Sequence, residues 1–137
     1  MRSFVLSLAS AVLCCGCGGR SDHADLNGEV LLDGQPLPDG SVLLVPVNSS
    51  KGTTAGGAIK DGKFAINGKA APGVGEYMVE IHASKLSGRK VQKAMGKKGE
   101  LDDEMVEAVA PRFNARTELR VEVKPGGTNA RFEVFSR

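Results

Sequence analysis

Short apolar runs separated by turn residues repeat along most of the chain. Two of the runs alternate cleanly in polarity: Tyr77, Val79 and Ile81 share one parity between polar neighbours, and the run at 119–124 behaves in the same way. Alternation with period two is typical of a half-buried strand. Seven short strands with turns at near-regular spacing predict an all-β fold, namely a seven-stranded antiparallel β-sandwich of the immunoglobulin or transthyretin type. The runs cover 26–32, 41–47, 51–60, 63–67, 76–82, 119–124 and 130–135.

Turn signals fall between these runs. The Asp-Gly pair at 61–62 lies between two strand-like runs and is the strongest hairpin signal in the chain. The Gly- and Pro-rich link at 33–40 cannot continue a helix or a central strand. Two glycines at 56–57 indicate a bulge or a close backbone approach inside the third strand. The Pro-Gly-Gly turn at 125–127 predicts that the last two strands form a closing hairpin.

Residues 83–116 interrupt the pattern and lack strand character, so we expect one long loop, of a length that is usually functional or disordered. Its acidic second half places Leu101, Met105, Ala108 and Val109 on one helical face, which predicts a short amphipathic helix over 101–109. That helix would either cover an open edge of the sandwich, which we favour, or present a partner-binding face. The first half carries the basic residues Lys85, Arg89, Lys90, Lys93, Lys97 and Lys98.

The basic stretch at 85–98 has two interpretations. It is either a solvated loop, which we favour, or a surface that docks anionic lipid head groups or an acidic polymer. In the first interpretation the acidic helix beside it would neutralise its charge.

The first residues form a segment of another kind. Arg2 precedes an apolar run of about a dozen residues, which predicts a secretory signal peptide over 1–16 that is too short to span a bilayer. The sequence at 14–17 resembles a bacterial lipobox, with Gly16 as the small residue before an acylated Cys17. We therefore expect a lipidated tether over 17–25 and a single β-sandwich domain over 26–137. An ordinary secretory cleavage near residues 18–19 is the alternative.

Cleavage before Cys17 would remove Cys14 and Cys15 and leave no free thiol, which excludes a disulfide or a cysteine metal site. The chain has 18 Lys and Arg against 16 Asp and Glu, and cleavage would remove only Arg2, so the mature protein would keep 17 basic residues. A net charge near +1 argues against nucleic acid as a partner.

Several segments together resemble the carboxypeptidase regulatory-like domain. They are GEVLLDGQPLPDGSV at 28–42, DGKF at 61–64, PGVGEYMV at 72–79 and LRVEVKPGG at 119–127, and the last is similar to the end of small bacterial lipoproteins built on this one domain. The resemblance implies a transthyretin-like, immunoglobulin-like sandwich. It also implies an accessory domain that is not itself catalytic, because the matching residues are turns and core positions.

Candidate catalytic and metal-binding residues are few. His23 lies in the expected tether and His82 ends a strand on its solvent parity, so both are interpreted as exposed and without a role in catalysis. Asp33, Asp39 and Asp61 could offer oxygens to Ca²⁺ at one loop end, but their spacing matches no calcium loop and turn formation explains them better. We therefore assign no catalytic residue, no metal site and no cofactor.

Binding sites for sugars usually contain exposed aromatic side chains. The chain has no Trp, Tyr77 has an inward parity, and Phe135 is the one outward candidate, for which edge packing is the favoured role. The transthyretin-like hydroxyisourate hydrolases end in Tyr-Arg-Gly-Ser, and this chain ends instead in EVFSR at 133–137.

These observations predict a non-enzymatic, lipid-anchored protein of the bacterial cell envelope that acts as a structural or protein-interaction module. Its partners would be the membrane, through fatty acyl chains such as palmitate on Cys17, and an envelope protein. Gly18 is not the Asp associated with inner-membrane retention in some bacteria, which favours the outer membrane. The alternatives are an envelope domain that binds a small ligand or glycan and, more remotely, a transthyretin-like hydrolase.

Overall fold

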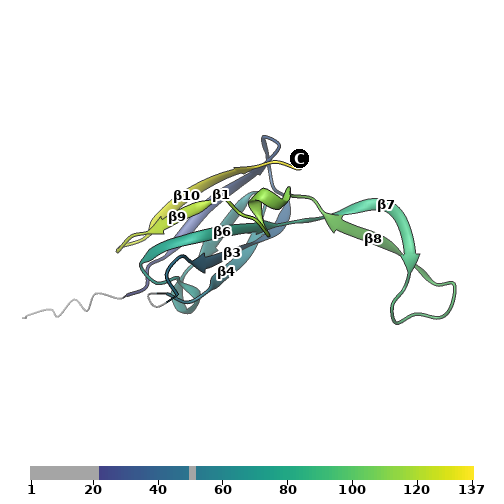
Figure 1. Ribbon diagram of the computed structural model, residues 1–137, viewed down its shortest axis with the longest axis horizontal. Coiled ribbons are helices and arrows are strands. Elements are labelled where there is room, and N and C mark those ends of the chain that lie inside the picture. The colour runs from purple at the N-terminus through teal and green to yellow at the C-terminus, as the bar shows by residue number, and fades with distance from the viewer. Residues whose placement is uncertain (1–21, 50–51) are drawn as a thin grey trace, which may run out of the picture.

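The computed structural model describes residues 22–49 and 52–137, and β-strands dominate them (Figure 1). The only helical segments in these ranges are two short 3-10 turns, at Gly68–Ala70 and Pro111–Phe113. The strands are β1 (Leu26–Leu32), β2 (Gln35–Pro36), β3 (Asp39–Pro46), β4 (Ala55–Lys60), β5 (Lys63–Ile66), β6 (Gly75–His82), β7 (Ser84–Gln92), β8 (Leu101–Glu107), β9 (Arg120–Val123) and β10 (Thr128–Val134).

One curled sheet forms the body of the molecule, and its strand order is β10-β1-β5-β4-β3-β6-β9, with β2 added to β1. The all-β, sandwich-like fold predicted from the sequence is confirmed. The seven expected strands correspond to β1, β3, β4, β5, β6, β9 and β10. The sheet is antiparallel except for β1 and β10, which pair in parallel from Leu26 opposite Thr128 to Leu32 opposite Val134.

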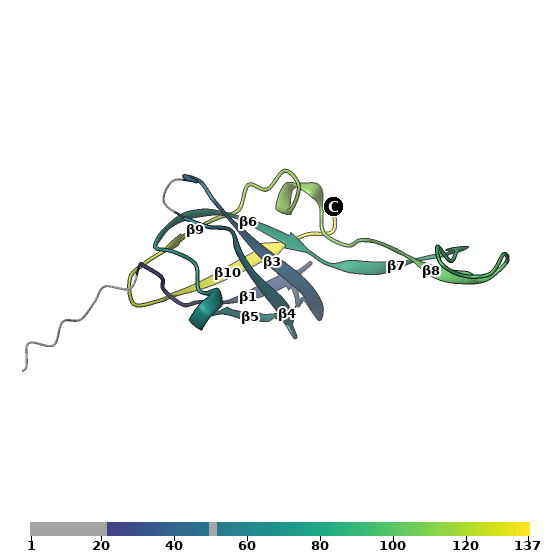
Figure 2. The ribbon, with the colours of Figure 1, turned by 90° about the horizontal axis from the view of Figure 1, so that it is seen from below.

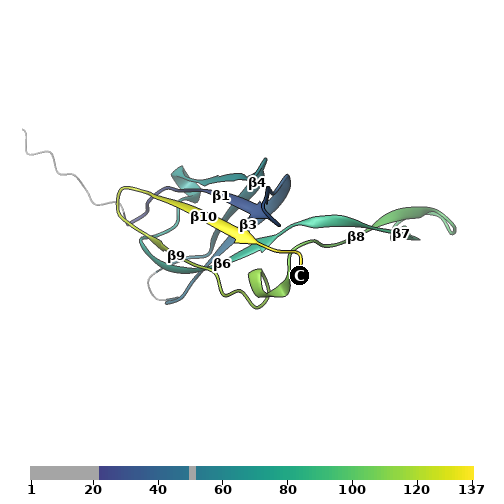
Figure 3. The same ribbon diagram turned by 90° about the horizontal axis from the view of Figure 1, so that it is seen from above.

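The predicted closing hairpin is wrong, because β9 and β10 do not pair with each other. β9 pairs with β6, and β10 pairs with β1 at the other end of the strand order. The turn at 124–127 therefore crosses between the two layers of the curl (Figure 3). The sequence pattern marks this turn correctly, but alternation within a strand does not specify its neighbour.

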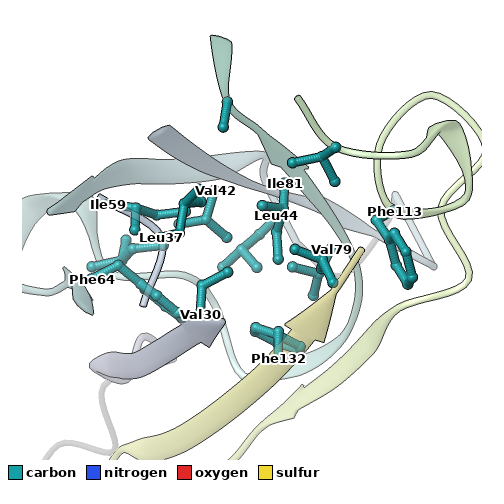
Figure 4. Packing of buried hydrophobic residues seen from close by; sticks show 14 of the residues in the cluster. Val30, Leu37, Val42, Leu44, Ile59, Phe64, Val79, Ile81, Phe113 and Phe132 are labelled. Carbon is teal, nitrogen blue, oxygen red and sulfur yellow. The ribbon is translucent and has the colours of Figure 1, made fainter. Parts of the chain in front are cut away.

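The hydrophobic core fills the inside of the curl (Figure 4). Tyr77, Val79 and Ile81 all point inward, as their parity predicts, and none is more than 1% exposed. Phe64 from β5 and Phe132 from β10 stack with ring centroids 6.3 Å apart. Both layers of the sandwich thus contribute to one core.

Several turns form as predicted. Asp61 and Gly62 both have positive φ, of 50° and 76°, as a two-residue hairpin turn between β4 and β5 requires. Gly56 allows a close backbone approach, since a Cβ there would lie 2.8 Å from the carbonyl oxygen of Val42.

Residues 83–116 differ most from expectation. In place of a long loop, β7 and β8 form a separate two-stranded sheet that projects from the body (Figures 1 and 2). We call Ser84–Glu107 the arm. The predicted helix over 101–109 is wrong, because residues 101–107 form β8. Leu101, Met105 and Val109 are spaced four apart, and this spacing places side chains on one face in a helix and in a strand alike.

The last residues of the expected tether, 22–25, contact the body. Ala24 is buried, its backbone N–H donates to the Pro72 carbonyl, and His23 forms a β-bridge with Gly73. Residues 22–25 therefore belong to the body. They lie at the end of the molecule opposite to the arm in all three views (Figures 1–3).

Candidate functional site

The arm is the most distinctive surface of the described chain. Its strands pair in antiparallel register from Ser84 opposite Glu107 to Gln92 opposite Leu101, with an irregularity between Leu86 and Lys90. None of the residues of β7 or β8 is buried. A two-stranded ribbon without a core is marginally stable in water, so interactions between its side chains have to hold it together.

Ion pairs across the ribbon supply part of that stability. Lys90 Nζ lies 2.7 Å from Asp103 Oδ1 and Lys93 Nζ lies 3.0 Å from Glu100 Oε1. The Asp103 carboxylate raises the pKa of Lys90, and the hydrogen bond from Lys93 lowers that of Glu100. Three of the six basic residues of this stretch are thus paired with acidic residues, from a paired strand rather than from a helix: Lys90, Lys93 and Arg89, whose Nε lies 3.1 Å from Glu104 Oε2. Since these pairs are exposed, each contributes little.

Several large apolar side chains of the arm are exposed. Leu86 and Met105 face each other directly across the ribbon and are 63% and 55% exposed. The parity of β8 places Leu101, which is 56% exposed, on the same face as Met105. Most large exposed apolar residues of the described chain belong to the arm, and only two belong to the body. The arm residues are Leu86, Val91, Met95, Leu101 and Met105, and the body residues are Val47 and Phe135.

The root of the arm is fixed by Glu107. Its Oε1 accepts the backbone N–H groups of Ala83 and Val109 at 2.9 and 3.2 Å, and its Oε2 lies 3.2 Å from His82 Nδ1. Burial alone would raise the pKa of Glu107, but the two N–H groups and His82 outweigh it, so the pKa lies below its usual value of 4.5. This carboxylate joins both strands of the arm to the body.

His82 is the last residue of β6, as expected from the sequence. Its surroundings do not suit nucleophilic catalysis. One ring nitrogen faces Glu107, and the other, Nε2, lies 3.3 Å from Glu80 Oε2. Ser41 lies opposite His82 in the β3–β6 register. With a carboxylate at each ring nitrogen, neither nitrogen is placed to accept a proton from a serine hydroxyl.

The three candidate calcium ligands take part in other interactions or in a turn. Asp39 pairs with Lys60 at 2.7 Å, and Asp33 accepts the Ser136 N–H, which together with the Ser136 side chain lowers the pKa of Asp33. Asp61 occupies its predicted turn. Within the described ranges, no three His, Cys, Asp or Glu residues lie close enough to hold a metal ion.

A shallow hollow of about 910 Å³ lies on the outer face of the body, over β10, β1, β5 and β4. Its small residues include Ala58 and Ala65, both exposed, and polar groups surround them. Arg131 lies 3.9 Å from Glu29 across this face. The other polar lining residues are Asn27, Lys60, Lys63 and Asn129.

A smaller hollow of about 270 Å³ is lined by Tyr77 and Glu76 among others. The Tyr77 hydroxyl is buried and has no hydrogen-bond partner of good geometry among the described residues. Burial raises the pKa of this phenol. Phe135, the outward aromatic candidate, lies 6.1 Å from Phe113, ring centroid to ring centroid, as edge packing requires.

Cys17, the predicted lipidation site, lies outside the described residues. The described ranges contain no helix with the length and apolar character that crossing a bilayer requires. The chain matches no family model, and searches of the curated proteins and of the solved structures found no match.

Sequence reasoning missed the arm as a structured element because its strands have no buried face. A strand is recognised by apolar alternation, whereas β7 and β8 carry adjacent like charges, such as Asp102, Asp103 and Glu104 in β8. The signal that could have revealed the arm is the order of charged segments along the chain. A basic segment, a Gly-containing turn at 96–99 and an acidic segment follow one another, and this order is typical of a hairpin held by cross-strand ion pairs.

Proposed function

We propose that this protein is a non-enzymatic, lipid-anchored component of the bacterial cell envelope, and that it acts through the arm as a protein-interaction module. The observation that carries the proposal is the exposed apolar pair Leu86 and Met105 on the arm, with exposed Leu101 farther along the same strand face. The Lys90–Asp103 ion pair lies between Met105 and Leu101 in the register. None of the three apolar side chains belongs to the hydrophobic core of the described residues. Exposed apolar side chains grouped in this way are typical of interaction sites.

The proposed lipid anchor rests on the lipobox-like sequence that ends at Cys17. The resemblance to carboxypeptidase regulatory-like domains supports an accessory role. The described chain starts at the end of the body opposite to the arm, so an anchor attached there would leave the arm accessible to other envelope proteins (Figure 1).

The anchor is tested by the intact mass and N-terminal sequence of the membrane-extracted protein. We expect a chain that begins at Cys17 and carries fatty acyl chains. An unmodified N-terminus at any other residue would refute lipidation while leaving the role of the arm open.

The role of the arm is tested by shortening it. Ser84 and Glu107 face each other in register, so a short Gly/Ser link can replace residues 85–106 while keeping Glu107 and the buried Ala108 and Val109. Cross-linking in cells followed by mass spectrometry should capture a specific envelope protein with the intact chain and lose it with the shortened chain. Capture of the same neighbours by both chains would contradict the proposal.

The hollow on the outer face of the body favours a second candidate, a small-ligand or glycan site. Lys63 and Arg131 at this hollow suit an anionic sugar. A thermal shift with anionic envelope glycan fragments, absent in Lys63→Gln/Arg131→Gln, would support it. No shift with the parent chain would reject it.

A further inference from the structure

The tip of the arm, residues 93–100, presents one apolar side chain beside unpaired positive charge. Met95 is 97% exposed and is the most exposed large apolar residue of the described chain. Lys97 and Lys98 follow it after Gly96 and form none of the ion pairs of the described residues, whereas Lys93 pairs with Glu100. The tip therefore combines one exposed apolar side chain, Met95, with two lysines that form no ion pair among the described residues.

Hydrogen bonds hold this tip in shape. The Gln92 side-chain amide donates to the carbonyl oxygens of Lys97 and Glu100, both at 3.0 Å, and its oxygen accepts the Gly99 N–H at 3.1 Å. The Glu100 carboxylate accepts the Lys97 N–H at 3.1 Å. These hydrogen bonds tie the loop to the Gln92 side chain, and the side chain of Met95 is left exposed to solvent.

We propose that the tip binds the surface of an anionic phospholipid bilayer. Lys97 and Lys98 contact phosphate-bearing head groups, and Met95 enters the boundary between head groups and acyl chains. An amphipathic element with an apolar residue next to lysines is suited to this interface. A soluble acidic polymer would engage the two lysines but would leave Met95 in water, so the apolar residue favours lipid.

The contact is weak by itself, since it uses one apolar side chain and two cations. Because the first described residues and the arm lie at opposite ends of the molecule, the tip reaches the anchoring membrane when the long axis lies along the bilayer (Figure 1). In that orientation tethering raises the local concentration of the tip, which then acts as a second attachment. This role rests on the proposed anchor at Cys17, whereas the affinity of the tip for anionic lipid does not. The test therefore uses the chain without acylation.

The chain has no Trp, so Met95→Trp introduces a single fluorescent reporter at the tip. The experiment uses the full chain carrying Cys17→Ser, with vesicles of phosphatidylcholine alone or with about one third phosphatidylglycerol. We expect a blue shift and quenching by brominated lipid only with the anionic vesicles. Val47→Trp, a reporter at an exposed apolar position on the body, should show neither change.

Adding Lys97→Gln/Lys98→Gln should weaken the vesicle response of the Met95→Trp chain by roughly fivefold for each lysine removed. Because Trp itself favours membrane interfaces, amide hydrogen exchange of the chain with Met95 retained provides a second readout. Protection confined to residues 93–99 on addition of anionic vesicles supports the proposal.

Two results would overturn it. One is the absence of any response to anionic vesicles, in fluorescence and in exchange. The other is protection of the tip by soluble polyphosphate without quenching by brominated lipid, which would identify an acidic polymer as the ligand. Failure of the anchor at Cys17 would affect neither measurement.

Discussion

Replacing Glu107 by Ala should loosen the arm from the body. The substitution removes the acceptor for two backbone N–H groups, those of Ala83 and Val109, and both residues are buried. A buried donor left without a partner costs about 1–3 kcal/mol. The Glu107 side chain is itself 40% exposed, so water reaches part of the site and the sum has to be reduced. We expect a loss of about 2 kcal/mol in the free energy of unfolding.

Urea unfolding followed by circular dichroism measures this loss. With a slope near 1–2 kcal/mol per M for a domain of this size, the midpoint should fall by about 1–2 M. Glu107→Gln is the matched control, because its amide oxygen still accepts the two N–H groups, while the charge and the oxygen that faces His82 are lost. Asp102→Ala, which removes an exposed carboxylate from the same strand and no ion pair described here, should change the midpoint little.

The effect should depend on pH in a definite direction. Because the pKa of Glu107 is lowered in the folded state, its contribution to stability is complete above its unfolded value of about 4.5 and is lost as pH falls through the folded pKa. The difference between the parent chain and Glu107→Ala should therefore be full at pH 7 and shrink below pH 4.5. An equal loss at pH 3 and pH 7, or an equal loss for Glu107→Gln and Glu107→Ala, would refute this account of the arm's root.

Three further predictions concern the core and the arm. Gly28→Ala should cost about 2–3 kcal/mol, because the new Cβ would lie 2.4 Å from the ring of Phe64, and a change in urea midpoint within error would contradict the packing described here. Tyr77→Phe should leave thermal stability unchanged or raise it by about 1 kcal/mol, since the buried hydroxyl has no partner; a clear loss would mean that an ordered water pairs with it. Leu86→Ser/Met105→Ser should leave the free energy of unfolding of the body within about 0.5 kcal/mol, and a larger loss would mean that this face packs on the body.

The body of the fold could be predicted because its strands have one buried face. The parity of Tyr77, Val79 and Ile81 follows directly from their burial in the core. The Asp-Gly turn at 61–62 was equally visible, because its two positive φ angles restrict the residues that fit. These features depend on neighbours in sequence.

The pairing partners of each strand, and the strand structure of the arm, could not be predicted in this way. β10 pairs with β1, a strand about 100 residues away, and no local pattern specifies that choice. The arm has no core face, so its strands depend on charge pairs such as Lys90–Asp103 that arise only once the register is set. The structural role of the Glu107 carboxylate could not be predicted for the same reason, since the N–H groups that it binds come from both ends of the arm.

The claim that the arm carries the function is tested most directly by photo-cross-linking in living cells. A photoreactive phenylalanine analogue placed at Leu86 would lie on the apolar face of the arm, and the same analogue at Ala58 would lie in the hollow on the body. We predict a discrete adduct with one envelope protein from position 86 and none from position 58. An adduct from position 58 alone, or the same diffuse adducts from both positions, would contradict the account.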